Sequence, residues 1–477
     1  MRAAFGFGFG LPLGDSGDAP AIDWNFTGGV LPSALTFSRA SLATMYAASG
    51  TLVWCPHNLL TYSEQIDNAA WSKSGGTTVT PNSTSDPNGG ATADTVAFAT
   101  TGEYAFNQYS TPSALQNYVF SIWLRAASPT TVNVVLQQSG GAQSSTTASV
   151  DTTWQRVQVS YTTDGAPTFL RASLFPNANT PTFYAWGAQL NVGTLQPYYP
   201  TTSAAYYGPR LTYDPVTHSA LGLLVEEQRT NLLLNSLIDG TNLSTQSVTV
   251  AATQYTLSFY GAGQIVLSGA ATATVVGAGA YPTRKTYTFT PSDGSLTLTV
   301  TGTVQFANLE AGAFETSYIP TGAASATRAA DVVTCTGSAF SQWFNASEGA
   351  LVVEFVPGSL SNTPAVLTTY PGGYGNNQAS ASTVSWWDGV SNTSATLPVS
   401  APAGASRRMA IAYDGSSYAL CGNGGSVVTA GRAPWASTPT SVQLGSISGA
   451  QWINGTIKRV RYWRKRLTNA QLQALTA

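Results

Sequence analysis

The stretch YVFSIWL, from Tyr118 to Leu124, decides the fold class of this chain. Four of its side chains fall on one face when the backbone is extended: Tyr118, Phe120, Ile122 and Leu124. Because successive side chains of a β-strand point to opposite faces, this spacing of two predicts a strand with one buried face. The same spacing recurs in WQRVQVSY (154–161) and ALVVEFV (350–356), so half-buried antiparallel strands are expected throughout the chain.

Turn-forming segments separate the predicted strands. SDPNGGAT (85–92) and YPGGYGNN (370–377) are rich in Gly, Pro and Asn, which are the residues that turns require. Only LTNAQLQAL (467–475) has the pattern of a helix, with Thr468 or Asn469 as its cap. Short strands at regular spacing with such turns predict an all-β protein built of tandem antiparallel β-sandwiches, the first of them a jelly roll.

The composition bounds the number of domains and the class of partner. A chain of 477 residues is expected to form roughly three domains. Only 9% of its residues are charged and the net charge is −2, so no field of one sign steers the protein to nucleic acid. No run of about 18 apolar residues occurs, and membrane insertion is therefore not expected.

The start of the chain, MRAAFGFGFGLPLGDSGD (1–18), alternates Phe and Gly after a single basic residue. A secretory signal peptide has a continuous apolar segment followed by a cleavage site of small residues. We therefore expect no signal peptide, and predict an uncleaved arm through which the protein attaches to a larger assembly.

Two phrases recur and divide the chain. NLL occurs at 58–60 and again at 231–233, and each copy opens a segment rich in predicted strands. The first segment ends WGAQLNVGTLQPYYPT (186–201) and the second FANLEAGAFETSYIPT (306–321). A lead-in segment precedes each copy. The predicted domains are an arm with the first lead-in (1–57), a jelly-roll sandwich (58–208), the second lead-in with a smaller sandwich (209–333), and a final sandwich (334–477).

A charge cluster in the second lead-in is the densest in the first two-thirds of this weakly charged chain. It contains His218, Glu226, Glu227 and Arg229, whereas the first lead-in has Arg39 and His57 but no acidic pair. A catalytic group would not be expected to vanish from one copy of a repeated scaffold. We favour a structural joint in which Arg229 pairs with a carboxylate, and keep an active site as the alternative.

Cysteine and histidine are scarce. Cys55, Cys335 and Cys421 are too scattered for a disulfide framework, and free thiols are expected, although Cys335 and Cys421 could meet within one domain. With two histidines in the chain, we predict neither a metal site nor a cofactor.

Four phrases closely resemble virion surface proteins of tailed bacteriophages, namely tail fibres, tail spikes and head fibres. The phrases are PRLTYDPVTHSALGLLVEEQRTNLL, NLLTYSEQIDNAAWSK, YIPTGAASATRAADVV and FNASEGALVVEF. The first sandwich also resembles jelly-roll carbohydrate-binding modules. The last resembles laminin G-like and concanavalin-like lectin sandwiches through GTIKRVRYWRKRLTNAQLQAL, but it lacks the spaced Asp and Asn of a calcium site.

The phrase WWDG (386–389) is the candidate glycan site. Adjacent strand residues point to opposite faces, so Trp386 and Trp387 cannot both be buried in one core. A sugar could stack on the exposed ring, with Asp388 accepting hydroxyls and Tyr370 and Tyr374 nearby in a Gly-rich loop. The alternative is a Trp that packs on a neighbouring domain or subunit.

The phrase KRVRYWRKR (458–466) is the candidate anion site or subunit contact. It interleaves aromatic residues with basic ones, of which four are singled out: Lys458, Arg459, Arg461 and Arg464. Phosphate or sulfate recognition is one interpretation. The other is an edge strand protected from aggregation by its charges, or paired with acidic groups of another chain.

Together these features predict a phage virion appendage, a fibre or spike, that attaches through its amino-terminal arm and binds host cell-surface glycan without covalent chemistry. Expected partners are capsid, portal or tail proteins and further copies of the chain, with a trimer as the expected form. The location would be the virion surface after synthesis in the host cytoplasm. One alternative is a purely structural decoration or connector; the other is a polysaccharide depolymerase with two carboxylates about 5 to 10 Å apart.

Overall fold

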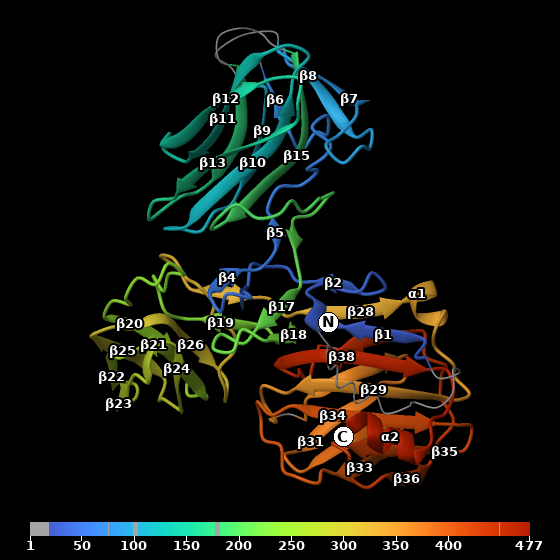
Figure 1. Ribbon diagram of the computed structural model, residues 1–477. Coiled ribbons are helices and arrows are strands. Elements are labelled where there is room, and N and C mark those ends of the chain that lie inside the picture. Colours follow the sequence, from blue (N-terminus) through green and yellow to red (C-terminus); the bar gives the residue numbers. More distant parts are fainter. Residues whose placement is uncertain (1–18, 75, 99–103, 177–181, 362, 448) are drawn as a thin grey trace, which may run out of the picture.

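The computed structural model describes residues 19–74, 76–98, 104–176, 182–361, 363–447 and 449–477. Strands make up 49% of the chain and helices 4%, and the sheets are antiparallel. The prediction of tandem antiparallel sandwiches is therefore confirmed, and Figure 1 shows three of them. The arm predicted at residues 1–18 lies outside the described residues.

Sandwich I contains the strand that the sequence singled out. One sheet has the order β13-β10-β15-β8-β7 and the other β12-β11-β14-β9-β6. Phe120, Ile122 and Leu124 of β10 are fully buried between the two sheets, as their spacing predicts. The strands are β6 (Ser72–Lys73), β7 (Thr78–Thr84), β8 (Ala93–Ala97), β9 (Phe106–Ser110), β10 (Asn117–Arg125), β11 (Thr130–Gln138), β12 (Gln143–Val150), β13 (Gln155–Thr162), β14 (Leu170–Pro176) and β15 (Thr182–Val192).

Sandwich II is the smaller unit. A four-stranded sheet, β20-β25-β22-β23, faces a three-stranded sheet, β24-β21-β26. Its strands are β20 (Gln246–Val250), β21 (Tyr255–Gly261), β22 (Gln264–Gly269), β23 (Ala273–Val276), β24 (Gly279–Phe289), β25 (Gly294–Thr301) and β26 (Gln305–Ala311).

Sandwich III is assembled from separate parts of the chain. Its eight-stranded sheet has the order β17-β18-β38-β29-β34-β35-β36 with β1 also paired to β38, and its seven-stranded sheet has the order β2-β28-β37-β30-β31-β32-β33. The carboxy-terminal part supplies β28 (Val332–Thr336), β29 (Gly349–Val356), β30 (Ala365–Tyr370), β31 (Tyr374–Ser380), β32 (Thr383–Trp387), β33 (Asn392–Thr396), β34 (Arg407–Tyr413), β35 (Ser417–Gly422), β36 (Val428–Gly431), β37 (Ser441–Leu444) and β38 (Gly455–Trp463).

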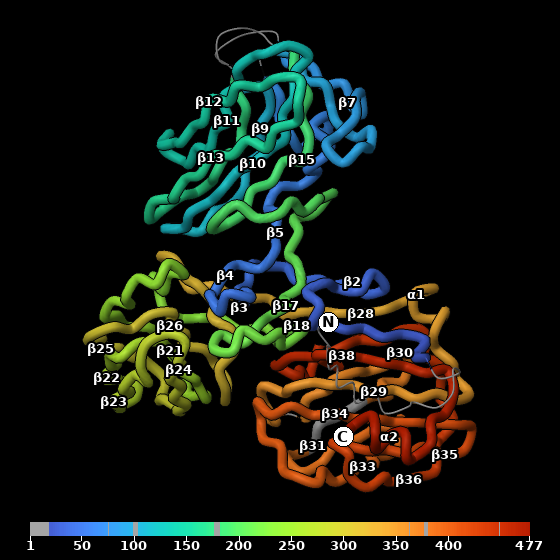
Figure 2. The backbone as a smooth tube through the Cα atoms, in the orientation of Figure 1, coloured from blue at the N-terminus to red at the C-terminus, as the bar shows by residue number. Residues whose placement is uncertain are grey.

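The lead-in segments supply the remaining strands of sandwich III: β1 (Ile22–Asn25), β2 (Thr36–Ser38), β17 (Arg210–Tyr213) and β18 (Ala220–Val225). In Figures 1 and 2 the blue β1 and β2 lie among the orange and red strands. The division expected at residues 57, 208 and 333 assigns these strands to lead-ins, whereas the structure places them inside sandwich III. Sandwiches I and II are therefore two insertions into a discontinuous third sandwich.

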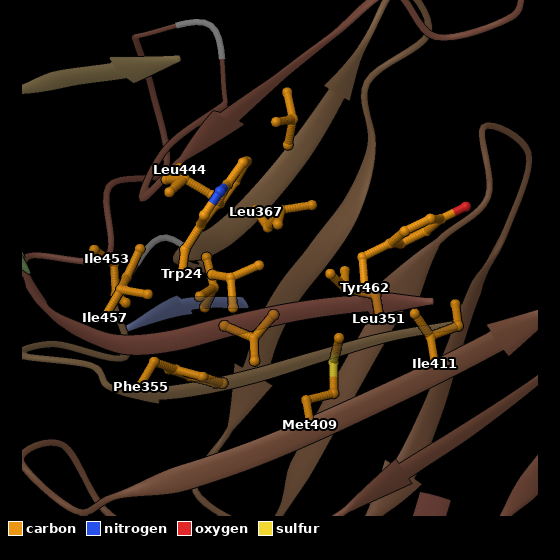
Figure 3. Packing of buried hydrophobic residues seen from close by; sticks show 14 of the residues in the cluster. Trp24, Leu351, Phe355, Leu367, Met409, Ile411, Leu444, Ile453, Ile457 and Tyr462 are labelled. Carbon is orange, nitrogen blue, oxygen red and sulfur yellow. The ribbon is translucent and has the colours of Figure 1, made fainter. Parts of the chain in front are cut away.

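Apolar side chains explain this arrangement. Trp24 and Phe26 from the first lead-in and Leu223 and Val225 from the second are buried in the core of sandwich III. Figure 3 shows Trp24 packed among residues of the carboxy-terminal strands. The edge of β38 that does not face β29 pairs with β18 along one half and with β1 along the other.

Short elements complete the fold. The helix α2 (Asn469–Thr476) begins with the predicted Thr468 cap, whose side chain accepts from the backbone of Gln471. The other short elements are η1 (Phe26–Gly28), α1 (Gly337–Ser341) and three two-stranded ladders, β3 (Thr44–Tyr46) with β4 (Leu52–Trp54), β5 (His57–Asn58) with β16 (Tyr206–Tyr207), and β19 (Arg229–Asn231) with β27 (Ala326–Arg328). Within the ranges that the structure describes, no helix has the length and apolar character needed to cross a membrane.

The repeated NLL phrase marks a repeated hydrogen-bond scaffold. Asn58 Nδ2 donates to the carbonyls of Ala188 and Tyr199, and its Oδ1 accepts from two backbone amides. Asn231 makes the corresponding four bonds, including donation to the carbonyls of Ala307 and Ile319. Each Asn thus ties the opening of its sandwich to the last strand of that sandwich, β15 or β26, and to the segment that follows this strand.

Candidate functional site

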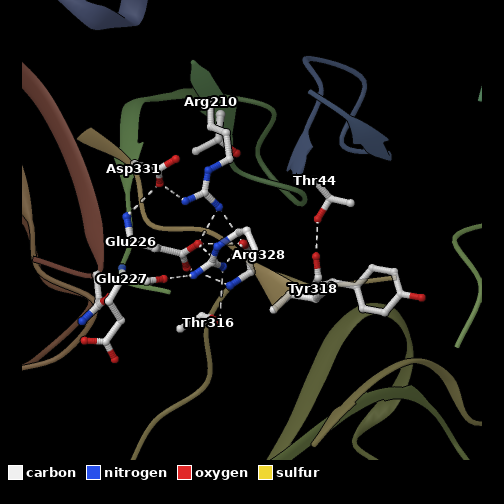
Figure 4. A network of polar contacts seen from close by, with 12 residues as sticks. Thr44, Arg210, Glu226, Glu227, Thr316, Tyr318, Arg328 and Asp331 are labelled. Atoms are coloured by element: carbon white, nitrogen blue, oxygen red, sulfur yellow. Dashed lines mark hydrogen bonds and ion pairs between the residues drawn. The ribbon is translucent and has the colours of Figure 1, made fainter. Parts of the chain in front are cut away.

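One residue of the charge cluster in the second lead-in, Glu226, lies in a buried joint with Arg210 and Arg328 (Figure 4). The Glu226 Oε2 atom accepts from Arg210 Nη1 at 2.5 Å and from Arg328 Nη1 at 2.6 Å. Ser317 donates to the same carboxylate from its backbone amide at 2.7 Å and from its hydroxyl at 2.6 Å. Both arginine side chains are fully buried. The lead-in is thereby bound to the segment that follows sandwich II.

A second carboxylate, Asp331, extends this joint. It accepts from Arg39 Nη1 at 3.0 Å, from Arg210, and from the backbone amide of Glu226 at 2.9 Å. Burial acts to raise the pKa of Glu226, but Arg328, Arg210 and the Ser317 hydroxyl lower it to about 2. Because this carboxylate stays ionised and is enclosed by donors, it is unsuited to act as a general acid. The geometry favours the joint over an active site.

The second acidic residue of the cluster behaves differently. Glu227 pairs with Arg229, as expected for that arginine, and 26% of the Glu227 side chain is exposed. The Arg229 guanidinium also lies over the Phe314 ring at 4.8 Å. The fully buried carboxylate is Glu226, whose partners are Arg210 and Arg328, and Arg229 is not among them.

Of the two histidines, His57 is buried in the fold, whereas His218 of the charge cluster is exposed and lies outside the joint. His57 is buried, with Nδ1 2.7 Å from the Cys55 carbonyl oxygen and Nε2 accepting from the Val192 amide at 2.7 Å. Burial lowers its pKa to about 4, so the ring is neutral at pH 7. Cys55, Cys335 and Cys421 are buried free thiols, as expected.

The two tryptophans of WWDG point to opposite faces of the seven-stranded sheet. Trp386 lies in the core and is 6% exposed, whereas Trp387 is half-buried on the other face. The cavities that Trp386 lines measure about 10 and 30 Å³, which is the scale of single waters and too small for a sugar ring. Trp387 is therefore the ring of this pair that solvent reaches.

The other members of this candidate site serve a turn. Asp388 is 7% exposed and accepts from the amides of Val390 at 2.9 Å and Ser391 at 2.7 Å. The Tyr374 ring is buried, and a Cβ at Gly389 would lie 2.6 Å from it. Gly389 has φ +92°, so this turn requires glycine for both its backbone and its packing. Tyr370 is half-buried at the end of β30.

Residues 458–463 of the basic phrase lie on β38, which pairs with neighbours on both sides, and residues 464–466 follow it. The expectation of a charged edge strand is therefore wrong, because the lead-in strands cover the edge that the carboxy-terminal sequence leaves free. Lys458 lies 3.8 Å from Glu354, Arg459 pairs with Asp23, and Arg464 donates to the Gln342 carbonyl at 3.3 Å. Arg461 lies over the Trp463 ring at 5.6 Å.

An aromatic face on sandwich I was missed by the sequence analysis. On the outer side of β9 and β14, the Tyr109 ring is 52% exposed and meets the Phe169 ring edge-on at 5.1 Å. Next to it, the Arg171 guanidinium lies 5.4 Å from the Tyr104 ring and 5.9 Å from the Phe175 ring. We call these residues, with Asn107 and Ser173 between them, the β9/β14 face.

Two polar groups beneath these rings lack partners. Ser173 and Asn107 are adjacent across the β14–β9 ladder and fully buried, and neither Ser173 Oγ nor Asn107 Oδ1 has a hydrogen-bond partner among the described residues. Arg171 and Phe175 flank Ser173 on its own strand, and the Tyr104 ring contacts both of them. These three side chains therefore lie over Ser173 and Asn107, which we call the polar row. An unpaired buried polar group costs about 1–3 kcal/mol, which a ligand hydroxyl could offset.

The alternation that builds this face is present in the sequence. In FNQYS (106–110) and LRASLF (170–175), the inward residues are mostly apolar and the outward ones are polar or aromatic. The signal could be found only after β9 and β14 were known to be neighbours, because each phrase alone reads as an ordinary half-buried strand.

Known solved structures resemble part of this chain. No family description and no curated protein matches it. Similar solved structures include the CBM22-1 xylan-binding domain of Paenibacillus barcinonensis Xyn10C, with 12% identity over 30% of this chain and 97% of that one, at a TM-score of 0.25. A family 16 carbohydrate-binding module has 20% identity over 28% of this chain and 99% of that one, at a TM-score of 0.23.

A third similar structure is the enzymatically active domain of bacteriophage CBA120 tailspike protein 4. It has 14% identity over 28% of this chain, at a TM-score of 0.24, and the match spans 21% of that protein's chain. Likenesses at these levels do not assign a function, which has to be argued from the residues of this chain.

Proposed function

We propose that this protein is a glycan-binding component of the surface of a tailed-bacteriophage particle, a fibre or spike, that acts without covalent chemistry. The observation that carries the glycan part of the proposal is the β9/β14 face. There the exposed Tyr109 ring, and Arg171 stacked on Tyr104, lie beside Ser173 and Asn107, each of which has a buried polar atom without a partner among the described residues. Flat rings for stacking, combined with unsatisfied hydrogen-bonding atoms, are the groups that a sugar requires.

The proposed binding mode follows from this geometry. One sugar ring stacks on Tyr109, and its hydroxyls reach the polar row when Arg171 and Tyr104, both half-buried, rotate aside. Stacking on one ring contributes about 1 kcal/mol, so a single site is weak and several copies on one particle are needed for firm adhesion.

The virion part of the proposal rests on the phrases that resemble tail fibres, tail spikes and head fibres. In this proposal the amino-terminal residues attach the protein to capsid, portal or tail, the chain assembles as a homo-oligomer, with a trimer as the expected form, and the location is the virion surface. The joint around Glu226 supports a non-enzymatic role for the one adjacent acidic pair. A purely structural connector remains the competing function.

Binding of the purified full chain to an array of bacterial surface polysaccharides tests the glycan part. Tyr109→Ala is expected to weaken binding about fivefold per site, as about 1 kcal/mol of stacking is removed. Trp387→Ala is the parallel test of the alternative glycan site, which lies on sandwich III. If no polysaccharide binds, the structural connector is the better account; if only Trp387→Ala weakens binding, the glycan site lies on β32.

A further inference from the structure

A hollow on the outer face of sandwich III gathers basic side chains from separate strands. It is a cavity of about 260 Å³ between β29, β34 and β38 on one side and the end of α2 on the other. Cavities near this size hold one small ligand. Its charged lining consists of Arg408, Arg459, Arg461 and Glu354, and its apolar walls include Val352 and Leu475.

The carboxylates near this cavity are already engaged. Glu354 lies 3.3 Å from Arg408 and 3.8 Å from Lys458, so two cations share one carboxylate. Both carboxylate oxygens of Asp23 accept hydrogen bonds from the Arg459 guanidinium, one of them from Nε at 2.6 Å. Arg408 also donates to an oxygen of Ala477, which lines the cavity, so Arg408, Lys458 and Arg459 all have negative or carbonyl partners.

Arg461 differs from these three cations in its side-chain contacts. Its backbone pairs with Asp23 on β1 and with Val352 on β29, but the Asp23 carboxylate turns to Arg459 instead. No hydrogen bond or ion pair joins the Arg461 guanidinium to any described residue, and this guanidinium lies over the Trp463 ring. Burial and the neighbouring Arg459 both lower its pKa, so its charge is poorly compensated in the free protein. A half-buried, stacked guanidinium is preorganised to bind an oxyanion with two parallel hydrogen bonds.

We propose that this cavity binds an acidic substituent of a saccharide, a carboxylate, sulfate or phosphate group, with Arg461 as the principal donor. Arg408 and Arg459 supply further positive charge at the rim, and their side chains are 42% and 41% exposed. The saccharide part of the inference rests on the proposed function, whereas the oxyanion part rests on Arg461. The site is on a different sandwich from the β9/β14 face, so one can fail without the other.

Calorimetric titration of the full chain tests the proposal. The probes are glucuronate, glucose 6-sulfate and glucose 6-phosphate, with neutral glucose and inorganic phosphate as references. We expect the acidic sugars to bind more tightly than glucose, and Arg461→Gln to weaken them about tenfold or more because the charge and the paired hydrogen bonds are removed. Tyr109→Ala should leave this binding unchanged.

Two further variants make the result interpretable. Arg464→Gln is the matched control, because Arg464 lies just beyond β38 and outside the cavity lining, and it should bind as the unmodified chain does. Arg461→Lys keeps the charge and should retain part of the affinity, which guards against misfolding of the Gln variant. Equal binding of glucose and glucuronate, or no effect of Arg461→Gln, would overturn the proposal. Inorganic phosphate binding as tightly as glucose 6-phosphate would overturn the saccharide assignment.

Discussion

Glu226→Gln tests the buried joint most directly. The substitution keeps the shape of the side chain and removes its charge, so the cluster of Arg39, Arg210 and Arg328 would face Asp331 alone. Breaking a buried ion pair costs about 3–5 kcal/mol. The pKa of Glu226 agrees with this range, because lowering it from 4.5 to about 2 corresponds to about 3 kcal/mol.

Urea denaturation measures this cost. At a slope of about 3 kcal/mol per M, the midpoint of the joint's transition should fall by about 1–2 M. Glu227→Gln is the control, since Glu227 is partly exposed and its ion pair contributes about 1 kcal/mol or less. The pKa of Glu226 is lower in the folded state, so its contribution is present above about pH 4.5 and lost as the pH falls toward 2, and Glu226→Gln should lack that loss. Equal midpoints for the two variants would refute the joint.

Four other outcomes follow from the structure. Asn231→Ala should lower the free energy of unfolding by about 3–4 kcal/mol in urea titrations, since buried backbone groups lose their partner, and an unchanged midpoint would contradict the repeated scaffold. Because burial lowers the pKa of His57 to about 4, stability should fall by about 3 kcal/mol as the pH drops from about 6.5 to 4, and His57→Gln should abolish that dependence in pH-series denaturation. In thermal denaturation, Trp386→Ala should cost about 3–5 kcal/mol and Trp387→Ala about 1 kcal/mol or less; equal costs would mean that both rings are packing elements. Residues 334–477 expressed alone should aggregate, as judged by size-exclusion chromatography, because they lack strands of both sheets, and a monodisperse folded product would refute the shared sandwich.

The class of fold was accessible from the sequence because the spacing of two is a local property. Phe120 and Ile122 alternate with outward residues whatever strand lies beside them. Pairing partners are not local, however, and nothing in the phrases that form β1 and β18 names β38 as their neighbour. The lead-ins were therefore recognised as segments, while their membership of sandwich III was not.

The sequence similarity between the two copies of the repeat, which form sandwiches I and II, is weak because different side chains fill the corresponding space in each copy. In sandwich I, Trp123 packs over Gly187, where a Cβ would lie 2.9 Å from the indole. At the corresponding bulge of sandwich II, Tyr260 meets Phe306 at 5.9 Å. A large residue beside glycine in one copy is thus replaced by two rings of intermediate size in the other. Asn58 and Asn231 persist because backbone groups, which do not vary, are their partners.

The candidate sites were also only partly predictable from the sequence. The alternation of strand residues correctly predicted that Trp386 and Trp387 lie on opposite faces. It could not show that the Asp388 carboxylate already accepts hydrogen bonds from the backbone amides of its own turn. The β9/β14 face and the cavity around Arg461 both combine side chains from strands that are distant in sequence. Such sites become visible only when the neighbours of each strand are known.

The pairing of β1 with β38 has a consequence for biosynthesis. Asp23 and Arg459, which pair across these strands, are 436 positions apart. Asp23 therefore leaves the ribosome long before Arg459 is synthesised. Sandwiches I and II come from contiguous stretches and can fold as they emerge, whereas Trp24, Phe26 and Leu223 must wait for the last strand before water is excluded from them. An interrupted translation product would therefore carry two finished sandwiches and a set of uncovered apolar strands, which gives the cell's quality control a direct means to recognise an incomplete chain.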